Sequence, residues 1–445
     1  MRLSVIGCGY LGAVHAACMA ELGHTVVGVD VDASRIGVLA EGRSPIHEPG
    51  LDELLRRNVD NGRLRFTTDP AEIADAQIHF IGVGTPQLPG RLAADMTYVN
   101  AALAAIIEHA RPQNGPALVA GKSTVPVGTA EALTATLKAH RDDLLLAWNP
   151  EFLREGHAVA DTVRPDRLVY GLPDDPTDAA TAKALLDECY ADLLAARVPL
   201  VEADLPTSEL VKVAANSFLA TKISFINAMA ELCEATGADV TKLATAIGYD
   251  ERIGSKFLQA GIGFGGGCLP KDIRAFMARA GELGVDQALT FLREVDAINL
   301  RRRDRAVEIA ESLVGDRLVG KKVAVLGIAF KPDTDDLRDS PALDIATRLW
   351  ARGAELSVVD PAAGEALKKA RPDLHVASSV DEAVAGADLV MVLTPWREFV
   401  ELDPVALKPF VKCANVIDGR NVLDPQRWHD AGWNYHGMGR VALQN

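Results

Sequence analysis

Residues 2–30, RLSVIGCGYLGAVHAACMAELGHTVVGVD, predict the fold at the start of the chain. A short apolar run leads into the pattern GxGxxG, formed by Gly7, Gly9 and Gly12, and a helical stretch follows. A second apolar run ends in Asp30, at roughly the 20-residue spacing that is typical of dinucleotide-binding domains. In such a domain the glycines let the backbone approach a pyrophosphate at the positive end of the helix.

The acidic residue bears on the choice of dinucleotide. A carboxylate at Asp30 is expected to accept hydrogen bonds from the adenosine ribose hydroxyls and to repel a 2′-phosphate, so we predict NAD rather than NADP. The alternative is a glycine turn in an α/β domain that holds no cofactor. The position of the three glycines between a strand and a helix favours the cofactor site.

Strand patterns alternate with helical patterns in the first part of the chain and again near its end. The strand candidates are LSVIG, TVVGVD, IHFIGVG, ALVAGKS, LLLAWNP, KKVAVLGIAF, ELSVVD, ADLVMVLTP and NVIDGR. Such alternation predicts parallel sheets with helices on both faces. Between Thr207 and Gly315 helical periodicity takes over. We therefore predict an α/β protein with two Rossmann-like, doubly wound domains, residues 1–206 and 316–445, joined by a central helical region, residues 207–315, with a long connecting helix.

The C-terminal domain repeats the strand, loop and strand plan less completely. Its first strand ends at Gly327 and the next ends at Asp360, but the loop AFKPDTDDLRDS intervenes. A loop of that length removes the tight turn that a dinucleotide needs. We expect no second full NAD site, and another nucleotide-like ligand is an alternative there.

The charge pattern argues against a nucleic-acid partner. The net charge is −15 at pH 7, and basic residues are scattered except for the run RRRDR at residues 301–305. Acidic residues lie within helical reach of this run, which indicates the exposed face of a long helix.

Cysteine, histidine and apolar patterns exclude other classes. The six cysteines and ten histidines show no spacing typical of a disulfide framework or a metal site, so we expect neither. No stretch approaches 18 apolar residues, which argues against a membrane span. The alanine-rich N-terminus resembles a signal peptide, but its glycines and the strand that follows indicate a folded domain. We expect a cytoplasmic protein whose central helices form a homodimer or higher homo-oligomer.

The stretch GFGGGCLPKD, residues 263–272, singles out Cys268. The other five cysteines lie in helical apolar patterns, in the glycine turn or near a late strand, and we interpret them as packing residues. Cys268 follows a glycine run and precedes Lys271 and Asp272. Because a nearby lysine stabilises a thiolate, we predict that Cys268 is a nucleophile.

A thiolate beside a nicotinamide suggests a two-stage oxidation. Hydride removal from an alcohol gives an aldehyde, the thiolate adds to form a thiohemiacetal, and a second hydride loss gives a thioester that water converts to a carboxylic acid. Lys212 and Asn216, spaced i, i+4 on a helix, could hold one oxygen. Glu151 and Glu155 show the same spacing just past a strand, where ligands of α/β domains bind. For each pair the alternative is an ordinary polar helix surface.

Several long motifs in series resemble a known family. They are VIGCGYLG, SPIHEPGL, GKSTVPVGT, NPEFLREG, ELVKVAANSFLA, RIGSKFLQAGIGFGGGCLPKD, GIAFKPDTDDLRDSP and IDGRN. Together they cover essentially the whole chain and resemble the UDP-glucose/GDP-mannose dehydrogenase family, within it the UDP-glucose 6-dehydrogenases. The resemblance implies a four-electron, NAD-dependent oxidation of UDP-glucose to UDP-glucuronate, and it implies that the C-terminal domain binds the UDP-sugar.

Three alternatives stay open beside this resemblance. The nearest is the same chemistry on GDP-mannose or another nucleotide sugar. A second is a two-electron alcohol or hydroxyacid dehydrogenase in which Cys268 only packs. A third is a catalytically silent protein that binds NAD or a nucleotide sugar.

The resemblance also implies roles for individual residues. The catalytic set would be Cys268 as nucleophile, Lys212 and Asn216 as the pair that orients the oxyanion and water, Asp272 and Glu151 as proton-handling carboxylates, and Thr124 on the catalytic water. Besides Gly7, Gly9 and Gly12, the cofactor would contact Leu11, Asp30, Arg35, Thr85, Thr124, Glu155, Lys271 and Arg338. The substrate would contact Phe152, Leu153, Arg154, Glu155, Lys212, Asn216, Phe257, Leu258, Gln259, Ala260, Gly261, Gly265, Lys331 and Arg420, with Arg252 supplied by a neighbouring subunit.

Two expectations concern the glycine-rich loop. We expect its glycines to let the backbone lie close to a hexose. Position 267 is glycine, where family members often carry a side chain such as serine, and this departure bears on the rigidity of the loop rather than on the reaction type.

Overall fold

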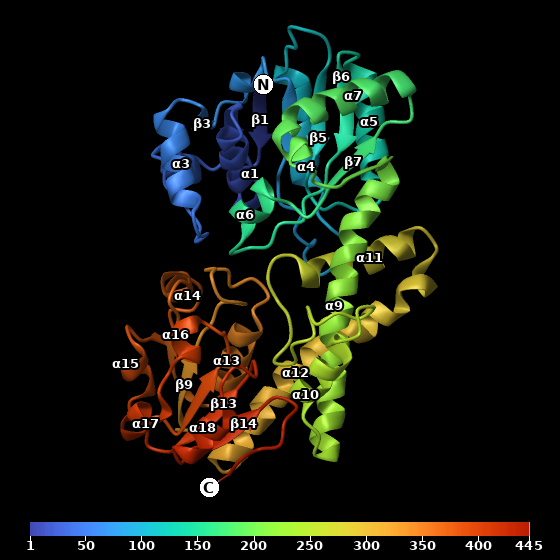
Figure 1. Cartoon of the computed structure of the whole chain (residues 1–445). Helices are drawn as coiled ribbons and strands as arrows, with labels where there is room; N and C mark the ends of the chain where they lie inside the picture. The colour runs from blue at the N-terminus through green and yellow to red at the C-terminus, as the bar shows by residue number, and fades with distance from the viewer. Residues whose placement is uncertain (445) are drawn as a thin grey trace. The chain divides into compact units, whose positions relative to one another are not determined.

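The computed structural model describes residues 1–444, which fall into two compact units (Figure 1). The N-terminal unit consists of Met1–Ala215 with Arg274–Leu283, and the C-terminal unit consists of Asn216–Ile273 with Gly284–Asn445. The central helices α9 (Leu205–Thr236) and α11 (Leu269–Glu282) therefore contribute residues to both units.

An eight-stranded sheet, in the order β3-β2-β1-β4-β5-β6-β7-β8, forms the centre of the N-terminal unit. The strands are β1 (Arg2–Ile6), β2 (Thr25–Val29), β3 (Leu64–Thr67), β4 (Ile78–Ile81), β5 (Ala117–Gly121), β6 (Leu144–Trp148), β7 (Leu168–Leu172) and β8 (Leu200–Asp204). The first six run parallel, β7 pairs antiparallel with β6, and β8 runs parallel to β7. Strand order reverses at β1 and β4, the position where doubly wound sheets bind ligands.

Helices cover both faces of this sheet. They are α1 (Tyr10–Glu21), α2 (Ala33–Ala40), α3 (Leu51–Asp60), the 3₁₀ turn η1 (Pro70–Ile73), α4 (Thr97–His109), α5 (Thr129–His140), α6 (Ala158–Val163), α7 (Pro176–Cys189) and α8 (Ala191–Ala195). Along β5, Leu118 and Ala120 join the core beneath α1, whereas Ala117 and Val119 join the core beneath α4 and α5. Because alternate residues point to opposite faces, a strand covered on both sides is apolar throughout.

The C-terminal unit contains a six-stranded parallel sheet in the order β11-β10-β9-β12-β13-β14. Its strands are β9 (Lys322–Leu326), β10 (Glu355–Val359), β11 (His375–Val376), β12 (Leu389–Val392), β13 (Asn415–Asp418) and β14 (Asn434–Gly437). Its helices are α10 (Val240–Gly248), η2 (Asp286–Leu289), α12 (Thr290–Val314), α13 (Pro341–Ala351), α14 (Gly364–Ala370), α15 (Val380–Val384), α16 (Arg397–Val400), α17 (Pro404–Leu407), η3 (Lys408–Phe410) and α18 (Pro425–Asp430). The apolar side of α12, including Ala306 and Ala310, packs in one core cluster with Val323 and Val325 of β9.

The two sheets confirm the predicted fold class. Each sheet also contains the same turn, in which a glycine after the first strand donates a hydrogen bond to the end of the neighbouring strand. Gly7 donates its backbone N–H to Val29 at 2.8 Å, and Gly327 donates to Val359 at the same distance. Both glycines have positive φ, +91° and +90°. In the C-terminal unit, however, α13 begins only at Pro341, so a loop rather than a helix N-terminus follows the turn.

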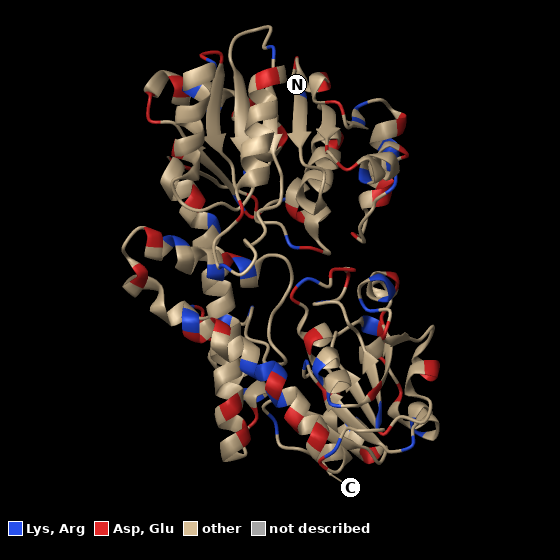
Figure 2. Cartoon of the chain, turned by 180° about the vertical axis from the view of Figure 1, so that it is seen from behind, with Lys and Arg blue, Asp and Glu red and all other residues tan. Residues whose placement is uncertain are grey.

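The arginines of residues 301–305 are not all on an exposed face, so that prediction is wrong. Arg302 and Arg303 of α12 are buried, and they pair with Glu234 and Asp344 at 3.0 and 3.1 Å. The carboxylates come from distant parts of the chain, which is why helical spacing did not reveal them. Elsewhere acidic and basic residues are interspersed along the ribbon of both units (Figure 2). Among residues 1–444, no helix is both long and apolar enough to cross a bilayer.

His79 is a titratable group buried in the middle of the first sheet. It lies on β4, its Nδ1 is 2.7 Å from Ser4 Oγ, and burial lowers its pKa to about 3. The unfolded chain protonates this histidine below about pH 6.5, whereas the folded chain does not until the pH approaches 3. The folded state is therefore destabilised by His79 as the pH falls from 6.5.

We predict that His79→Asn makes the protein less sensitive to acid. Between pH 7 and pH 5 the histidine accounts for a loss of about 2 kcal/mol, so the fall in Tm should be smaller in the variant by about 5 °C. Differential scanning fluorimetry across this pH range measures the effect. His140→Asn, on the exposed end of α5, is the control. Equal pH dependence of Tm in His79→Asn and the parent protein would contradict the assignment.

Candidate active site

Glycine is required at two of the three positions of the first turn. A Cβ on Gly12 would overlap the carbonyl oxygen of Gly7, and a Cβ on Gly7 would lie 2.9 Å from the Cα of Val83. Backbone atoms of this kind cannot move aside, so α1 can start against the end of β1 only with glycine there. At Gly9, by contrast, a Cβ would meet no atom within 4 Å. The open space lies in front of the N-terminus of α1, where backbone N–H groups favour an anion.

Asp30 lies beside this turn at the end of β2. Its carboxylate accepts hydrogen bonds from the backbone N–H of Cys8 at 2.7 Å, from Asp32 at 2.9 Å and from the guanidinium of Arg35 at 2.9 Å. Two predicted cofactor residues, Asp30 and Arg35, are thus in direct contact. The open space at a helix N-terminus and the adjoining acidic residue fit a dinucleotide.

Two more predicted cofactor residues meet at the carboxyl ends of neighbouring strands. Thr85 follows β4, and its hydroxyl donates to the backbone carbonyl of Thr124, which follows β5, at 2.7 Å. Leu11 lies in the first turn of α1. All of these positions lie at the edge of the sheet formed by the carboxyl ends of its parallel strands.

Glu151 and Lys212 form an ion pair within the N-terminal unit. The Nζ of Lys212 lies 3.0 Å from Glu151 Oε1, and both side chains are largely buried. Glu151 also accepts the backbone N–H of Leu153 at 2.6 Å, and Lys212 Nζ lies 5.6 Å from the ring centroid of Phe152. The ion pair therefore joins the loop after β6 to the first turns of α9. Glu155 is buried in the same loop.

Arg154, on that same loop, contacts another residue of the protein. Its guanidinium pairs with Asp161 at 2.7 Å, and its backbone N–H donates to the same carboxylate at 2.9 Å. Arg252 likewise pairs with Asp250 at 2.6 Å in the C-terminal unit and is well exposed. These two predicted substrate residues are joined to acidic neighbours rather than to other predicted site residues.

A buried lysine that the sequence analysis did not single out lies near Glu151. Lys122 follows β5, and its Nζ donates to the carbonyl oxygen and the side-chain oxygen of Asn149 at 3.2 and 2.8 Å. Tyr190 donates to the same side-chain oxygen at 2.7 Å. Burial lowers the pKa of Lys122 to about 8, and the charge of Glu151 opposes that shift. Its place at the carboxyl end of a strand is the signal that could have revealed it.

Cys268 lies at the N-terminus of α11, and it is the cysteine classed as exposed among residues 1–444. Its carbonyl accepts the first helical hydrogen bond, from the N–H of Asp272 at 3.0 Å, so Cys268 occupies the N-cap position. The buried carboxylate of Asp272 accepts from the amide of Asn216 and pairs with Lys271, both at 2.6 Å. A helix N-terminus and a nearby ammonium group are features that stabilise a thiolate. Cys268, Lys271 and Asp272 thus lie within about one helical turn, and Asn216 contacts Asp272 directly.

The glycines before Cys268 are required by contacts within the protein. A Cβ on Gly265 would overlap the carbonyl oxygen of Asp339, and one on Gly266 would lie 2.7 Å from the ring of Phe330. The atoms that exclude a side chain belong to the protein itself. Packing of the loop against Phe330 and Asp339 therefore requires glycine at these positions, and the expected approach of the backbone to a hexose stays a prediction.

Gly267 is crowded by a side chain rather than by backbone. A Cβ there would overlap the guanidinium of Arg338, which also pairs with Asp336 at 2.7 Å. Arginine can move aside, so a serine at this position is sterically accessible at the cost of displacing Arg338. Glycine at this position thus leaves room for the guanidinium of Arg338, one of the predicted cofactor residues.

Arg420 and Lys331 occupy the same unit. The partly buried Arg420 donates from its guanidinium to the carbonyls of Gly263, Leu393 and Phe330, at 2.7, 2.9 and 3.2 Å. Burial lowers the pKa of Arg420 to about 10. Lys331 Nζ lies 5.4 Å from the ring centroid of Phe330. Arg420 therefore ties the glycine-rich loop to two loops at the carboxyl ends of β9 and β12.

The remaining predicted substrate residues lie on the loop that precedes the glycine run. Leu258, Ala260 and Gly261 are buried, and Gln259 is exposed. Phe257 has a φ of +64°, an uncommon conformation for an aromatic residue. Among residues 1–444, no group of three or more His, Cys, Asp or Glu side chains could hold a metal ion.

We predict that alanine at Gly9 weakens cofactor binding, whereas alanine at Gly12 lowers thermal stability. Gly9→Ala should leave Tm unchanged but weaken NADH binding about tenfold or more, because its methyl group enters the open space before α1. Gly12→Ala should lower Tm by about 5 °C or more, because the backbone of Gly7 cannot yield. Thermal unfolding and fluorescence titration with NADH measure both. If Gly9→Ala bound NADH as the parent protein does, the phosphate position would be wrong.

Three family models match successive parts of the chain. Residues 1–194 match the NAD binding domain of the UDP-glucose/GDP-mannose dehydrogenase family, residues 206–301 match its central domain, and residues 324–425 match its UDP binding domain. The first match confirms the prediction that the cofactor is NAD.

Individual relatives match over nearly their full length. A UDP-glucose 6-dehydrogenase of Rhizobium meliloti (strain 1021) is 41% identical over 443 residues, 99% of this chain and 100% of that protein. One of Bacillus subtilis (strain 168) is 39% identical over 448 residues, 100% of this chain and 98% of that protein. The structure of a UDP-glucose dehydrogenase from Pyrobaculum islandicum superposes with a TM-score of 0.88 at 37% identity, covering 99% of this chain and 98% of that one. This chain belongs to the UDP-glucose/GDP-mannose dehydrogenase family of NAD-dependent oxidoreductases.

Proposed function

We propose that this protein oxidises UDP-glucose to UDP-glucuronate through a covalent intermediate on Cys268. The observation that carries the proposal is an exposed thiol at the N-cap of α11, one turn from the Lys271, Asp272 and Asn216 cluster. The choice of UDP-glucose is supported by the names of the relatives and by the match to a UDP binding domain.

The reaction would proceed in two oxidations at the C6 carbon of the sugar. The C6 alcohol first loses a proton and a hydride and becomes an aldehyde. Cys268 Sγ then bonds to the aldehyde carbon, giving a thiohemiacetal that loses a second hydride to become a thioester. Water adds to the thioester carbon, the C–S bond breaks, and the thiolate and the carboxylate are released. Bound NAD would accept the hydride in each oxidation.

The chain's own groups would orient the oxygens and move the protons. Lys212 and Asn216, one turn apart on α9, would donate to the oxyanion of the thiohemiacetal and to the attacking water. Asp272 and Glu151, each already bonded to one of those donors, would take up the released protons. Thr124 would contact the catalytic water.

The domains would divide the remaining work. We propose that residues 1–206 hold NAD through the glycine turn, Asp30 and Arg35, as the fit of that turn supports. Residues 316–445 would hold the UDP part of the substrate. Arg420 would act there by fixing the positions of the loops around it, because its guanidinium already donates hydrogen bonds to three carbonyls.

The ratio of NADH formed to sugar consumed tests the reaction. We expect two NADH per UDP-glucose and less turnover with GDP-mannose or UDP-N-acetylmannosamine. Cys268→Ser should lose acid production by about a thousandfold or more while still binding NADH and UDP-glucose, because an alcohol is a far weaker nucleophile than a thiolate. Absorbance at the NADH band and quantified sugar products measure both effects.

Cys413→Ser is the matched control, since Cys413 is a partly exposed thiol of the same unit outside the proposed site. One NADH per sugar with a stable aldehyde, or normal acid production by Cys268→Ser, would refute the covalent route. Preference for GDP-mannose would refute the substrate assignment alone.

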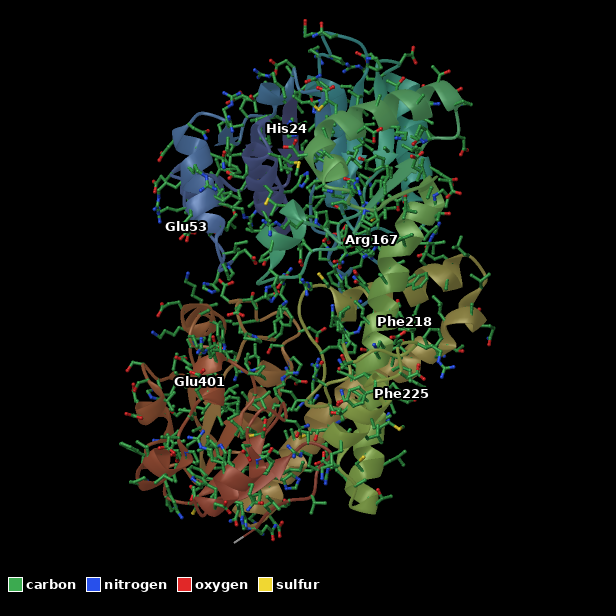
Figure 3. All side chains as sticks on the ribbon, in the orientation of Figure 1. His24, Glu53, Arg167, Phe218, Phe225 and Glu401 are labelled. Carbon is green, nitrogen blue, oxygen red and sulfur yellow. The ribbon has the colours of Figure 1, made fainter. Side chains whose placement is uncertain are left out.

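We also propose that α9 pairs two copies of the chain. Phe218, Phe225 and Leu232 are spaced by seven residues on this helix and are 67%, 50% and 57% exposed. Figure 3 shows Phe218 and Phe225 projecting from α9. Large apolar side chains in such a stripe are typical of a helix that packs against a partner.

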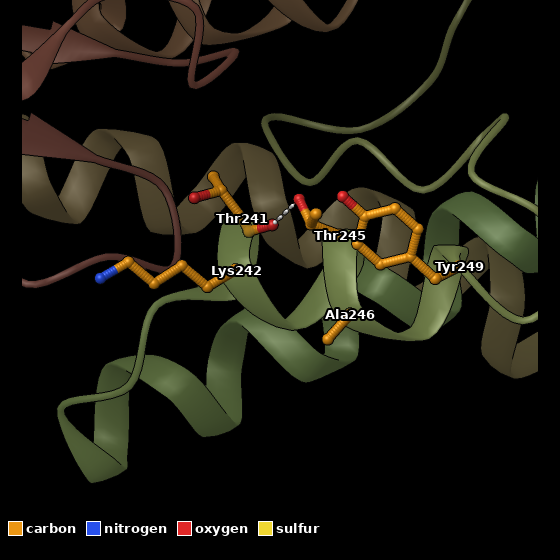
Figure 4. Close-up of a pocket in the computed structure, with 5 residues that line it drawn as sticks. All are labelled: Thr241, Lys242, Thr245, Ala246 and Tyr249. Atoms are coloured by element: carbon orange, nitrogen blue, oxygen red, sulfur yellow. Dashed lines mark hydrogen bonds between the residues drawn. The ribbon is translucent and has the colours of Figure 1, made fainter.

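Helix α10 packs on α9, since Val240 and Leu243 lie in one core cluster with Ile226 and Ala230. Figure 4 shows an open pocket on α10, lined by Thr241, Lys242, Thr245, Ala246 and Tyr249, and Tyr249 is 82% exposed. Arg252, implied by resemblance to enter a neighbouring subunit's site, follows in the next turn and is also well exposed.

We predict that the double variant Phe218→Glu, Phe225→Glu is monomeric, because four buried carboxylates per dimer would repel each other across the interface. Light scattering coupled to gel filtration gives the mass. Val405→Glu, at an exposed apolar position on α17, introduces one carboxylate away from α9 and should leave the mass unchanged. A double variant with the parent's mass would contradict the α9 interface.

A further inference from the structure

The backbone just before the glycine run is buried and has no strand partner of its own. Residues 260–266 are all buried. Buried backbone N–H and C=O groups need hydrogen-bond partners, and an irregular segment must find them outside itself. Here the partners come largely from side chains and loops of distant elements.

Side chains of α9 and α12 hold the first part of this segment. Asn227 of α9 accepts the N–H of Gly261 at 2.9 Å, and Arg302 of α12 donates to the carbonyl of Gly261 at 3.3 Å. A Cβ on Gly261 would lie 2.6 Å from the carbonyl oxygen of Gly419. The chain is thus confined from three sides at this residue.

Asn299 of α12 holds the next part more completely. Its amide oxygen accepts the N–H of Phe264 at 2.7 Å, and its amide nitrogen donates to the carbonyl of Phe264 at 3.0 Å. One side chain therefore satisfies both backbone groups of one residue, as a neighbouring strand would. A Cβ on Gly263 would overlap the amide oxygen of Asn299, so the amide and the glycine fit each other.

The side-chain amide is the group that this position requires. Asn299 is fully buried, and both of its polar atoms are used on Phe264. Arg303, one turn along α12, reaches the same carbonyl only at 3.4 Å. An apolar residue of similar volume would fill the space but leave the N–H of Phe264 without its acceptor.

We propose that Asn299 is a positioning residue for Cys268: it fixes the peptide groups of Phe264 and thereby sets where the thiol lies at the N-terminus of α11. The connection is short, since only Gly265, Gly266 and Gly267 lie between Phe264 and Cys268, and all three are packed against other residues of the same unit. The proposal rests on the nucleophile role of Cys268 for its effect on turnover, but not for its effect on the thiol itself.

Asn415 provides a matched control in the same unit. It is also buried, it begins β13, and its amide donates to the carbonyl of Asp388 at 3.0 Å and accepts from Asn434 at 2.8 Å. Removing either amide costs two hydrogen bonds in the same unit. The two variants should therefore lose similar stability and differ in what happens at Cys268.

The experiment compares Asn299→Ala, Asn299→Asp and Asn415→Ala in the full chain. Alkylation of Cys268 by iodoacetamide at pH 7, followed by mass spectrometry of its peptide, reports on the thiol directly. For Asn299→Ala we expect an alkylation rate and a kcat each about tenfold lower than in the parent, with KM for NAD changed less than about twofold. Asn415→Ala should show the parent's alkylation rate and kcat at a similarly lowered Tm.

Asn299→Asp keeps the acceptor for Phe264 and loses the donor, so its alkylation rate and kcat should lie between those of the alanine variant and the parent. It replaces Asn299→Ala in the experiment if that variant does not fold. A parent-like alkylation rate and kcat in the folded Asn299 variants, despite a lowered Tm, would overturn the positioning role. The alkylation result stands even if Cys268→Ser proves active, so a failed nucleophile assignment and a failed positioning role give different outcomes.

Discussion

The approach of α1 to the end of β1 is the constraint on which the N-terminal unit depends. Helix and strand come so close that position 12 must be glycine, and the carbonyl of Gly7 occupies the place where a side chain would be. This closeness aims the N-terminus of α1 at the switch point between β1 and β4. The ends of β4, β5 and β6 then supply Thr85, Thr124 and Glu151 along the same edge. One steric contact thus orders the candidate cofactor site.

Periodicity in the sequence predicted most of the strands that are covered on both faces, but it missed the buried β7 and several strands at the margins of the sheets. Nine strand candidates coincide with β1, β2, β4, β5, β6, β9, β10, β12 and β13. The missed strands include β8, which is largely exposed, and β11, which has two residues. Such strands lack the continuous apolar run that marks a buried one. The buried ion pairs of Arg302 and Arg303 were also missed, since their partners are far away in sequence.

In the candidate site, too, the sequence reveals the features that depend on local patterns and not those that depend on contacts between distant segments. The glycine turn, Asp30 and the setting of Cys268 are local patterns, so spacing revealed them. Asn299 and Arg420 act through backbone atoms of remote segments, and the sequence carries no pattern for such contacts. Residue roles drawn from resemblance name positions but not bonding partners, which is why Arg420 was expected only to face a ligand.

The repeated turn has a consequence for changing the cofactor. In both units the second strand ends in an aspartate that accepts the N–H of the residue after the turn glycine, Cys8 for Asp30 and Ile328 for Asp360, each at 2.7 Å. In the C-terminal copy the carboxylate also accepts the N–H groups of Ala329, Ala362 and Ala363. The aspartate therefore accepts the hydrogen bond that closes the turn, whether or not a ligand binds there. Protein engineering aimed at NADP would have to replace that bond as well as the charge of Asp30.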